Sequence, residues 1–224
     1  CSRWLSGRAK KSYLLRGKAV LSIPNPIDTK VYHPMDQGMA RELLGLPSGK
    51  RLLLFGALNV TDKRKGIDYL IEALRRMEKQ DVELVVFGQV KDDIRGLFPV
   101  PIHSMGYLSD ESKIVALYNA VDMFITSSLE ENLPNTIMES MACGTPCVGF
   151  EIGGIPEMID HRVNGYVANY KDAGDLANGI QWVLEHEDRL ALSDACVKKV
   201  QENYTEEVVA KQYTALYEKL LKGE

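Results

Sequence analysis

Residues 128–150 read SLEENLPNTIMESMACGTPCVGF and contain the features that decide the fold. An acidic loop leads to Pro134, a residue that is tolerated near a helix start because it lacks a backbone N–H. We therefore expect the first helical turn over residues 133–136, with free N–H groups pointing outward. The apolar run at 146–150 predicts a buried strand after this helix. Free N–H groups at a helix start form an anion site.

Two carboxylates flank this predicted anion site. Glu131 lies in the loop and Glu139 lies on the helix, with seven residues between them. They would repel a phosphate, and carboxylates only accept hydrogen bonds, so their natural partners are the hydroxyls of a ribose or hexose. The pattern predicts a site for a phosphorylated sugar. It leaves two plainer roles open: Glu131 could stabilise the helix N-terminus, and Glu139 could be a satisfied interior carboxylate.

The chain around this stretch predicts an α/β fold with a doubly wound parallel sheet. From Leu52 onward, short apolar runs alternate with helical patterns, which is typical of a sheet covered by helices on both faces. Ligands of such sheets bind outside the carboxyl ends of the strands. The predicted strands are 51–57, 82–87, 102–105, 121–126, 146–150 and 166–168, and the predicted helices between them are 67–79, 109–119 and 134–142.

Composition and charge narrow the function classes. The 224 residues, 45% of them hydrophobic and 26% charged, suit a globular protein, and the net charge of −4 predicts no nucleic-acid partner. No apolar run approaches the roughly 18 residues that span a bilayer, and no signal peptide leads the chain, so we expect a cytoplasmic protein. The four cysteines, Cys1, Cys143, Cys147 and Cys196, have no paired spacing and are interpreted as reduced core residues.

The segment from Glu131 to Val148 resembles the E-x7-E signature of family 4 retaining glycosyltransferases, which have the two-domain GT-B fold. The resemblance covers most of residues 52–170, in family order. It implies that the chain is the Rossmann-like C-terminal half of a GT-B fold, which binds a nucleotide-diphosphate sugar. The further matches are Arg64-Lys65-Gly66 before a helix, Ser109-Asp110-Glu111 after Gly106, Gly153-Gly154-Ile155-Pro156-Glu157, and Asn164-Gly165.

The resemblance also implies roles for single residues. Lys65 would neutralise the leaving diphosphate and Glu131 would hold hydroxyls of the donor sugar, which makes these two the expected catalytic residues. Glu139 would hold the ribose. Gly56-Ala57 stands where the family carries Gly-Arg, so Arg64 or Lys63 would supply the second positive charge. The backbone of Asn132, Leu133, Asn135 and Thr136 would hold the phosphates, and Gly88, Tyr107 and Leu108 would form the wall of the nucleobase site.

No cofactor or metal is expected besides the donor. The four histidines have no metal-ligand spacing. The pair Asp92-Asp93 is not the Asp-x-Asp metal motif of the other large glycosyltransferase fold.

Three segments are expected along the chain: 1–36 as a remnant of an N-terminal domain with its linker, 37–204 as the donor-binding domain, and 205–224 as a helix that packs back toward the N-terminal segment. Thr205 is the expected N-cap of that helix. Residues 1–18 carry six cations and no acid, which fits either a membrane-surface helix or a helix of the absent domain, followed by a strand at 20–27. The cations are Arg3, Arg8, Lys10, Lys11, Arg16 and Lys18.

The predicted function is therefore metal-independent, retaining transfer of a sugar from a nucleotide donor, as in polysaccharide biosynthesis. The saccharide or lipid-linked acceptor would bind to the absent N-terminal domain, which could also contact the inner face of the membrane. The isolated chain is expected to bind donor weakly and to be inactive. The alternative is a non-catalytic module that binds nucleotide sugars; a nucleotide-sugar epimerase is disfavoured because no complete acid/base set is visible.

Overall fold

The computed structural model of the chain describes residues 2–59, 62–77, 81–89 and 95–223; Cys1, Asp92 and Asp93 lie outside these ranges. Six parallel strands form one sheet in the order β3-β2-β1-β4-β5-β6, so the strand order reverses between β1 and β4. This confirms the predicted doubly wound parallel sheet. The strands are β1 (Arg51–Asn59), β2 (Val82–Gln89), β3 (Ile102–Gly106), β4 (Met123–Thr126), β5 (Cys147–Phe150) and β6 (Gly165–Ala168).

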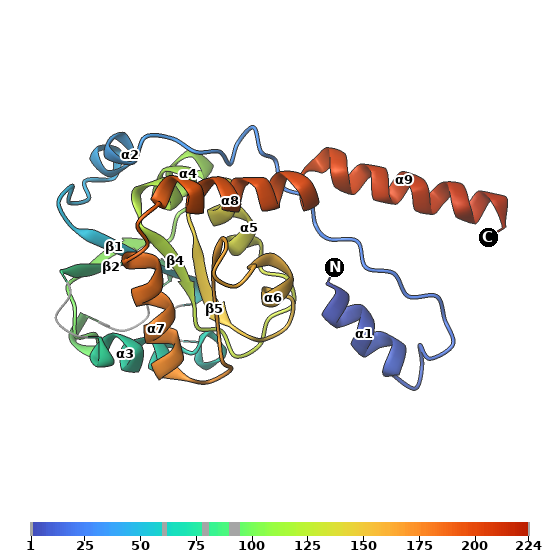
Figure 1. Cartoon of the computed structure of the whole chain (residues 1–224), viewed down its shortest axis with the longest axis horizontal. Helices are drawn as coiled ribbons and strands as arrows, with labels where there is room; N and C mark the ends of the chain where they lie inside the picture. Colours follow the sequence, from blue (N-terminus) through green and yellow to red (C-terminus); the bar gives the residue numbers. More distant parts are fainter. Residues whose placement is uncertain (1, 60–61, 78–80, 90–94, 224) are drawn as a thin grey trace.

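Helices cover both faces of the sheet (Figure 1). On one face, α3 (Ile67–Arg76) and α7 (Ala173–Leu184) pack against each other. On the other face lie α4 (Glu111–Ala120), α5 (Asn135–Ala142) and α8 (Arg189–Asn203). All residues of β4 and β5 are buried, as expected for strands that are covered on both sides. The remaining helices of this body are α2 (Gln37–Leu44), which packs on α4, and the short α6 (Ile155–Met158).

Local capping explains where several helices begin. Asp110 caps α4 by accepting a hydrogen bond from the Ser112 N–H, and Thr205 caps α9 (Glu206–Lys222) by accepting one from the Val208 N–H, as predicted. Pro134 occupies the N-cap position of α5, so that helix begins one residue after the proline. The cysteines Cys143, Cys147 and Cys196 are free and buried, as predicted.

The N-terminal segment differs from its prediction. Helix α1 covers only Arg3–Lys11, because Ser12 ends it with both its N–H and its hydroxyl donating to the carbonyl of Ala9. The predicted strand at 20–27 is wrong: residues 20–26 have no β-pairing, and Ile27 forms a single bridge with Thr205. The physical reason is that Pro24 and Pro26 cannot donate to a strand ladder.

Helix α9 extends away from the sheet, on the same side of the molecule as α1 (Figure 1). Its start lies beside the N-terminal segment, where the Ile27 N–H donates to the carbonyl of Tyr204 (2.8 Å). Of its residues only Val209 is buried, and Tyr213, Tyr217 and Leu220 are 41–62% exposed. No helix among the described residues is long and apolar enough to cross a bilayer.

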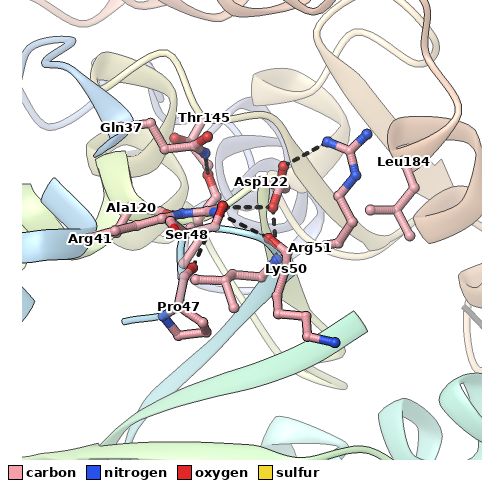
Figure 2. A network of polar contacts seen from close by, with 12 residues as sticks. Gln37, Arg41, Pro47, Ser48, Lys50, Arg51, Ala120, Asp122, Thr145 and Leu184 are labelled. Atoms are coloured by element: carbon pink, nitrogen blue, oxygen red, sulfur yellow. Dashed lines mark hydrogen bonds and ion pairs between the residues drawn. The ribbon is translucent and has the colours of Figure 1, made fainter. Parts of the chain in front are cut away.

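A buried ion network fastens the amino ends of the central strands (Figure 2). The carboxylate of Asp122, just before β4, accepts hydrogen bonds from Arg41 of α2 (3.0 Å), Arg189 of α8 (2.5 Å) and Arg51 of β1 (3.3 Å). It also accepts one from the Leu52 N–H (2.7 Å). The network therefore holds β1, β4, α2 and α8 together at the sheet edge opposite the carboxyl ends.

Candidate functional site

Two loops meet at the carboxyl ends of the central strands β1 and β4, between which the strand order reverses. The loop after β1 contains the 3-10 segment Lys63–Lys65, and it is tied to the loop after β4 by two hydrogen bonds. The Ser127 hydroxyl donates to the carbonyl of Lys65 (2.9 Å), and the Leu129 N–H donates to the carbonyl of Arg64 (2.7 Å). This is the edge at which doubly wound sheets bind ligands.

Gly66 permits this close approach of the two loops. Its φ of +63° lies in the left-handed region, and a Cβ added there would come within 2.0 Å of the carbonyl oxygen of Ser127. Only glycine therefore fits between the Lys65 loop and the end of β4. The backbone that carries Lys65 is thereby fixed before any ligand binds.

The two predicted catalytic residues form an ion pair across these loops. Lys65 Nζ lies 2.5 Å from Glu131 Oε1, and the side chains are 32% and 16% exposed. Glu131 does not cap α5, because no side-chain capping hydrogen bond is present at the start of that helix. The structure thus places Glu131 opposite Lys65 and not at the helix N-terminus.

Arg64 points elsewhere. Its side chain is 69% exposed, and its guanidinium pairs with Asp62 of its own loop at 2.7 Å. The hydrogen bonds from Arg64 lower the pKa of Asp62 to about 2, and the Asp62 carboxylate in turn raises the pKa of Arg64. In the free chain Arg64 is therefore part of an exposed turn, while Lys65 alone of these two faces Glu131.

The predicted phosphate-binding turn lies at the start of α5 and is held from behind by the Gly153-Gly154 loop. Gly153 has a φ of +59°, and a Cβ there would come within 1.9 Å of the carbonyl oxygen of Glu131. The Gly154 N–H donates to the carbonyl of Asn132 (2.5 Å), and Leu133 is buried behind the turn. The motif singled out in the sequence thus supports the backbone of the loop that carries Glu131.

The N-terminal segment contacts this same turn. The Ser2 hydroxyl donates to Asn132 Oδ1 (2.5 Å), and Asn25 Nδ2 donates to Asn135 Oδ1 (3.4 Å). Thr136 is partly buried beside Asn135. The side chains of Asn132 and Asn135, whose backbone is predicted to hold the phosphates, thus contact residues from the first 25 of the chain.

Glu157 fastens α1 to this part of the molecule. Its carboxylate accepts hydrogen bonds from the backbone N–H groups of Arg3 (2.9 Å) and Trp4 (2.8 Å) at the start of the helix, and it also pairs with the Arg3 guanidinium. A carboxylate at a helix N-terminus satisfies free donors and complements the helix dipole. The N-terminal segment is therefore anchored by a residue of the Gly-Gly-Ile-Pro-Glu motif.

Glu139 lies about one helical turn beyond Asn135 and Thr136, on the same side of α5. Its Oε2 accepts a hydrogen bond from the hydroxyl of Tyr118 (2.8 Å). Burial raises the pKa of Glu139 and the nearby Glu111 raises it further, while the bond from Tyr118 lowers it. Glu139 is thus a partly buried carboxylate with one oxygen already bound.

The residues predicted to face a nucleobase lie at the carboxyl ends of β2 and β3, on the same side of the sheet as Lys65 and Glu131. Gly88 is buried within β2 with a φ of +122°, Tyr107 is 61% exposed just after β3, and Leu108 packs against the core. Their position suits the predicted wall, and their contact with a base stays a prediction.

Sequence reasoning missed Ser2, Asn25, Ser127 and Tyr118 as parts of this site. Ser127 follows β4 directly, at a position where this fold places ligand loops, so its position was a usable signal. Tyr118 reads as an ordinary apolar helix residue, and nothing in the sequence distinguishes it. Ser2 and Asn25 are more than 100 residues away from their partners along the chain.

Two cavities of about 210 Å³ lie apart from the Lys65–Glu131 pair. One is lined by Asp122, Arg189 and Cys143 at the amino edge of β4 and β5, and it is not taken as the site because ligands of this fold bind at the opposite edge. The other lies between Arg3, Leu133 and Tyr204. Within the described ranges no three His, Cys, Asp or Glu side chains gather as a metal site requires.

The fold and the loops at its switch point define a Rossmann-like domain of the GT-B type. The profile of the family Glycosyl transferases group 1 matches residues 49–186, which is more than half of the chain. The chain therefore belongs to the glycosyltransferase group 1 family.

Known proteins agree with this assignment. N-acetyl-alpha-D-glucosaminyl L-malate synthase of Bacillus anthracis is 24% identical over 92% of this chain and 55% of its own length, so the chain spans about half of that relative. Two solved structures, each 21% identical, share the fold. Anabaena Alr3699/HepE in complex with UDP-glucose has a TM-score of 0.76 over 91% of this chain and 58% of its own. The C-terminal domain of the group 1 glycosyltransferase LpcC of Francisella tularensis has a TM-score of 0.67 over 80% and 99%.

Proposed function

We propose that this chain is the C-terminal, donor-binding domain of a two-domain, family 4-like retaining glycosyltransferase. Its fold matches nearly all of a solved C-terminal domain from the same family and about half of longer relatives. The first 36 residues are then a remnant of the acceptor domain with its linker, and Thr205, at the start of the C-terminal helix, pairs with Ile27 of that remnant. The acceptor, a saccharide or a lipid-linked sugar, binds to the domain that completes the enzyme, where contact with a membrane surface also occurs.

One observation carries the proposal. Lys65 from the loop after β1 and Glu131 from the loop after β4 meet at 2.5 Å on either side of the topological switch point, next to the start of α5. Independent elements thus bring a cation, a carboxylate and free helix N–H groups to one edge of the sheet. A nucleoside diphosphate sugar presents the matching groups, namely two phosphates and a set of hydroxyls. A solved structure of the same fold contains UDP-glucose.

In this proposal, separate groups of the chain bind the diphosphate, the sugar and the ribose of the donor. The N–H groups at the start of α5 and the Lys65 ammonium hold the diphosphate and stabilise its charge as the bond to the sugar breaks. Glu131 accepts hydrogen bonds from the sugar, and Glu139 accepts them from the ribose, so that the donor is oriented at both ends. No metal is required, because Lys65 and the helix dipole supply the positive charge. The chain alone binds donor weakly and transfers nothing.

The test is a binding titration of the 224-residue chain with UDP, GDP and ADP and their hexose derivatives. We expect one nucleoside diphosphate to raise the melting temperature, because a ligand that binds only the native state stabilises it by mass action. Lys65→Ala should weaken that binding about tenfold or more, the effect of losing one charge-assisted hydrogen bond. The matched control is Lys199→Ala, which removes a comparably placed pair with Asp160 (2.7 Å) far from the site. Equal affinities of wild type and Lys65→Ala would contradict the proposal.

The catalytic part is tested in the complete two-domain protein. Lys65→Ala and Glu131→Ala should each reduce transfer strongly while the fold is retained. Unchanged transfer by both variants would instead favour a module that binds nucleotide sugars without acting on them.

A further inference from the structure

Tyr118 is a buried, hydroxyl-bearing side chain close to the proposed site. It lies in the last turn of α4 and is 1% exposed. Its ring packs edge-on against Phe87 of β2 (centroids 6.2 Å apart) and against Phe124 of β4 (6.0 Å apart). Because both neighbours belong to the sheet, the phenol has one position, and its hydroxyl is aimed at α5.

That hydroxyl donates to Glu139 Oε2 at 2.8 Å. A buried hydroxyl needs a partner, and a carboxylate is among the strongest acceptors. Glu139 Oε1 has no hydrogen-bonding partner among the residues that the structure describes. Since a carboxylate has two acceptor oxygens, one is fixed by Tyr118 and the other stays available to a ligand.

We propose that Tyr118 is the positioning residue for Glu139: it holds one carboxylate oxygen so that the other faces the ribose hydroxyls of the donor. The inference rests on the proposed function, which assigns Glu139 to the ribose. A carboxylate on a free side chain would have to be ordered when the donor binds, at a cost in rotamer entropy. The bond from Tyr118 orders it beforehand.

Phe87 extends this support toward the diphosphate end of the site. A Cβ on Gly56, near the end of β1, would lie 1.8 Å from the Phe87 ring, so the ring rests on the glycine backbone. Gly56 therefore fixes Phe87, Phe87 packs on Tyr118, and Tyr118 holds Glu139. The contacts run without a break from the strand that precedes Lys65 to the predicted ribose carboxylate.

The experiment compares Tyr118→Phe with wild type in titrations of a ribonucleoside diphosphate and its 2′,3′-dideoxy analogue. UDP, GDP and ADP are titrated first, and the tightest binder is used. Wild type should prefer the ribonucleotide about tenfold, the effect of a hydrogen bond to a charged acceptor. Tyr118→Phe should reduce this preference to about threefold or less, because its Glu139 is no longer oriented. Affinity for the dideoxy analogue should stay unchanged.

The matched control is Tyr166→Phe. Tyr166 is also buried, and its hydroxyl donates to the carboxylate of Asp175 at 2.8 Å, the same length as the bond from Tyr118. A merely structural effect of losing such a bond would appear in both variants as a lower melting temperature. Only Tyr118→Phe should change the ribose preference.

The pH profile supplies a second readout. The titratable groups around Glu139 are Glu111 and Tyr118 of α4, Tyr32 and Cys143, and burial raises the pKa of Cys143 to about 12. Loss of the Tyr118 bond removes an interaction that lowers the pKa of Glu139. The acid limb of ribonucleotide affinity should therefore move to higher pH in Tyr118→Phe and disappear in Glu139→Gln.

The outcomes separate the two proposals. A wild-type ribose preference that survives intact in Tyr118→Phe, with an unmoved acid limb, overturns the positioning role and leaves the proposed function standing. A wild-type chain that binds none of the three nucleotides overturns the proposed function and this inference together.

Discussion

Replacing Asp122 by alanine should destabilise the fold far more than the loss of a surface ion pair. Asp122 and Arg41 are 2% and 6% exposed at their side chains, so the variant leaves the guanidinium of Arg41 buried without its counter-charge. Breaking such a buried pair costs about 3 to 5 kcal/mol. The Leu52 N–H also loses its acceptor. Against a total stability of about 5 to 15 kcal/mol, we expect the free energy of unfolding to fall by about 3 to 5 kcal/mol.

The assay is urea unfolding at neutral pH, followed by circular dichroism, with the free energy extrapolated to zero denaturant. The control is Asp81→Ala, since Asp81 pairs with Lys50 while both side chains are exposed (74% and 37%). That variant should stay within about 1 kcal/mol of wild type, as exposed pairs do.

The reasoning fails if Asp122→Ala and Asp81→Ala lose similar free energies. Such a result would mean that water reaches Arg41 in the variant, or that its other bonds suffice. Arg41 also donates to the carbonyl groups of Ala120 (2.7 Å), Ser48 and Lys50 (both 3.0 Å). These acceptors are neutral, so they do not replace the carboxylate charge. The comparison therefore isolates the electrostatic part of the network.

Three further predictions follow from the contacts around the site. Gly66→Ala should lower the free energy of unfolding, measured in urea, because its φ is +63° and its Cβ would meet the carbonyl of Ser127. The control Gly45→Ala has a similar φ of +65° but open space around the Cβ, so it should lose only about 1 to 2 kcal/mol. Equal losses in the two variants would contradict the packing argument. Glu157→Ala should speed hydrogen exchange of the amides at the start of α1, whereas slow exchange would show that other contacts hold that helix. Glu139→Gln should raise the free energy of unfolding at pH 7. Burial raises the pKa of Glu139 in the folded state above its ordinary 4.5, so ionisation of Glu139 opposes folding as the pH rises above 4.5. The gain in stability should therefore vanish below pH 4.5.

Much of the fold could be predicted because the relevant physics is local. Thr205 and the proline before α5 predict helix starts because of the properties of their own side chains. The buried strands are predicted from runs of apolar residues. The predicted strand at 20–27 was wrong: the apolar residues of this segment favour a strand, but Pro24 and Pro26 have no N–H to donate to a strand ladder. Apolar content signals burial, but pairing also needs a neighbouring edge.

The candidate site could be predicted only in part. The positions of Lys65 and Glu131 follow from the strand ends that precede them, and the structure places the two side chains in contact. The bond between Tyr118 and Glu139 depends on how α4 sits against α5, which no spacing in the sequence encodes. Likewise, the Ser2–Asn132 contact joins residues 130 positions apart. Tertiary contacts of this kind have no local signature.

The free chain already gives each acid of the site a partner, and this bears on how it would bind a donor. Glu131 is neutralised by Lys65, and Glu139 is supported by the neutral hydroxyl of Tyr118. If the diphosphate recruits Lys65, it replaces Glu131 as the anionic partner of the ammonium. The release of Glu131 then leaves a carboxylate that needs donors at the moment when the sugar hydroxyls arrive. Binding of the diphosphate and recognition of the sugar are therefore coupled through a single ion pair, while the backbone around it, fixed by Gly66 and Gly153, does not have to move.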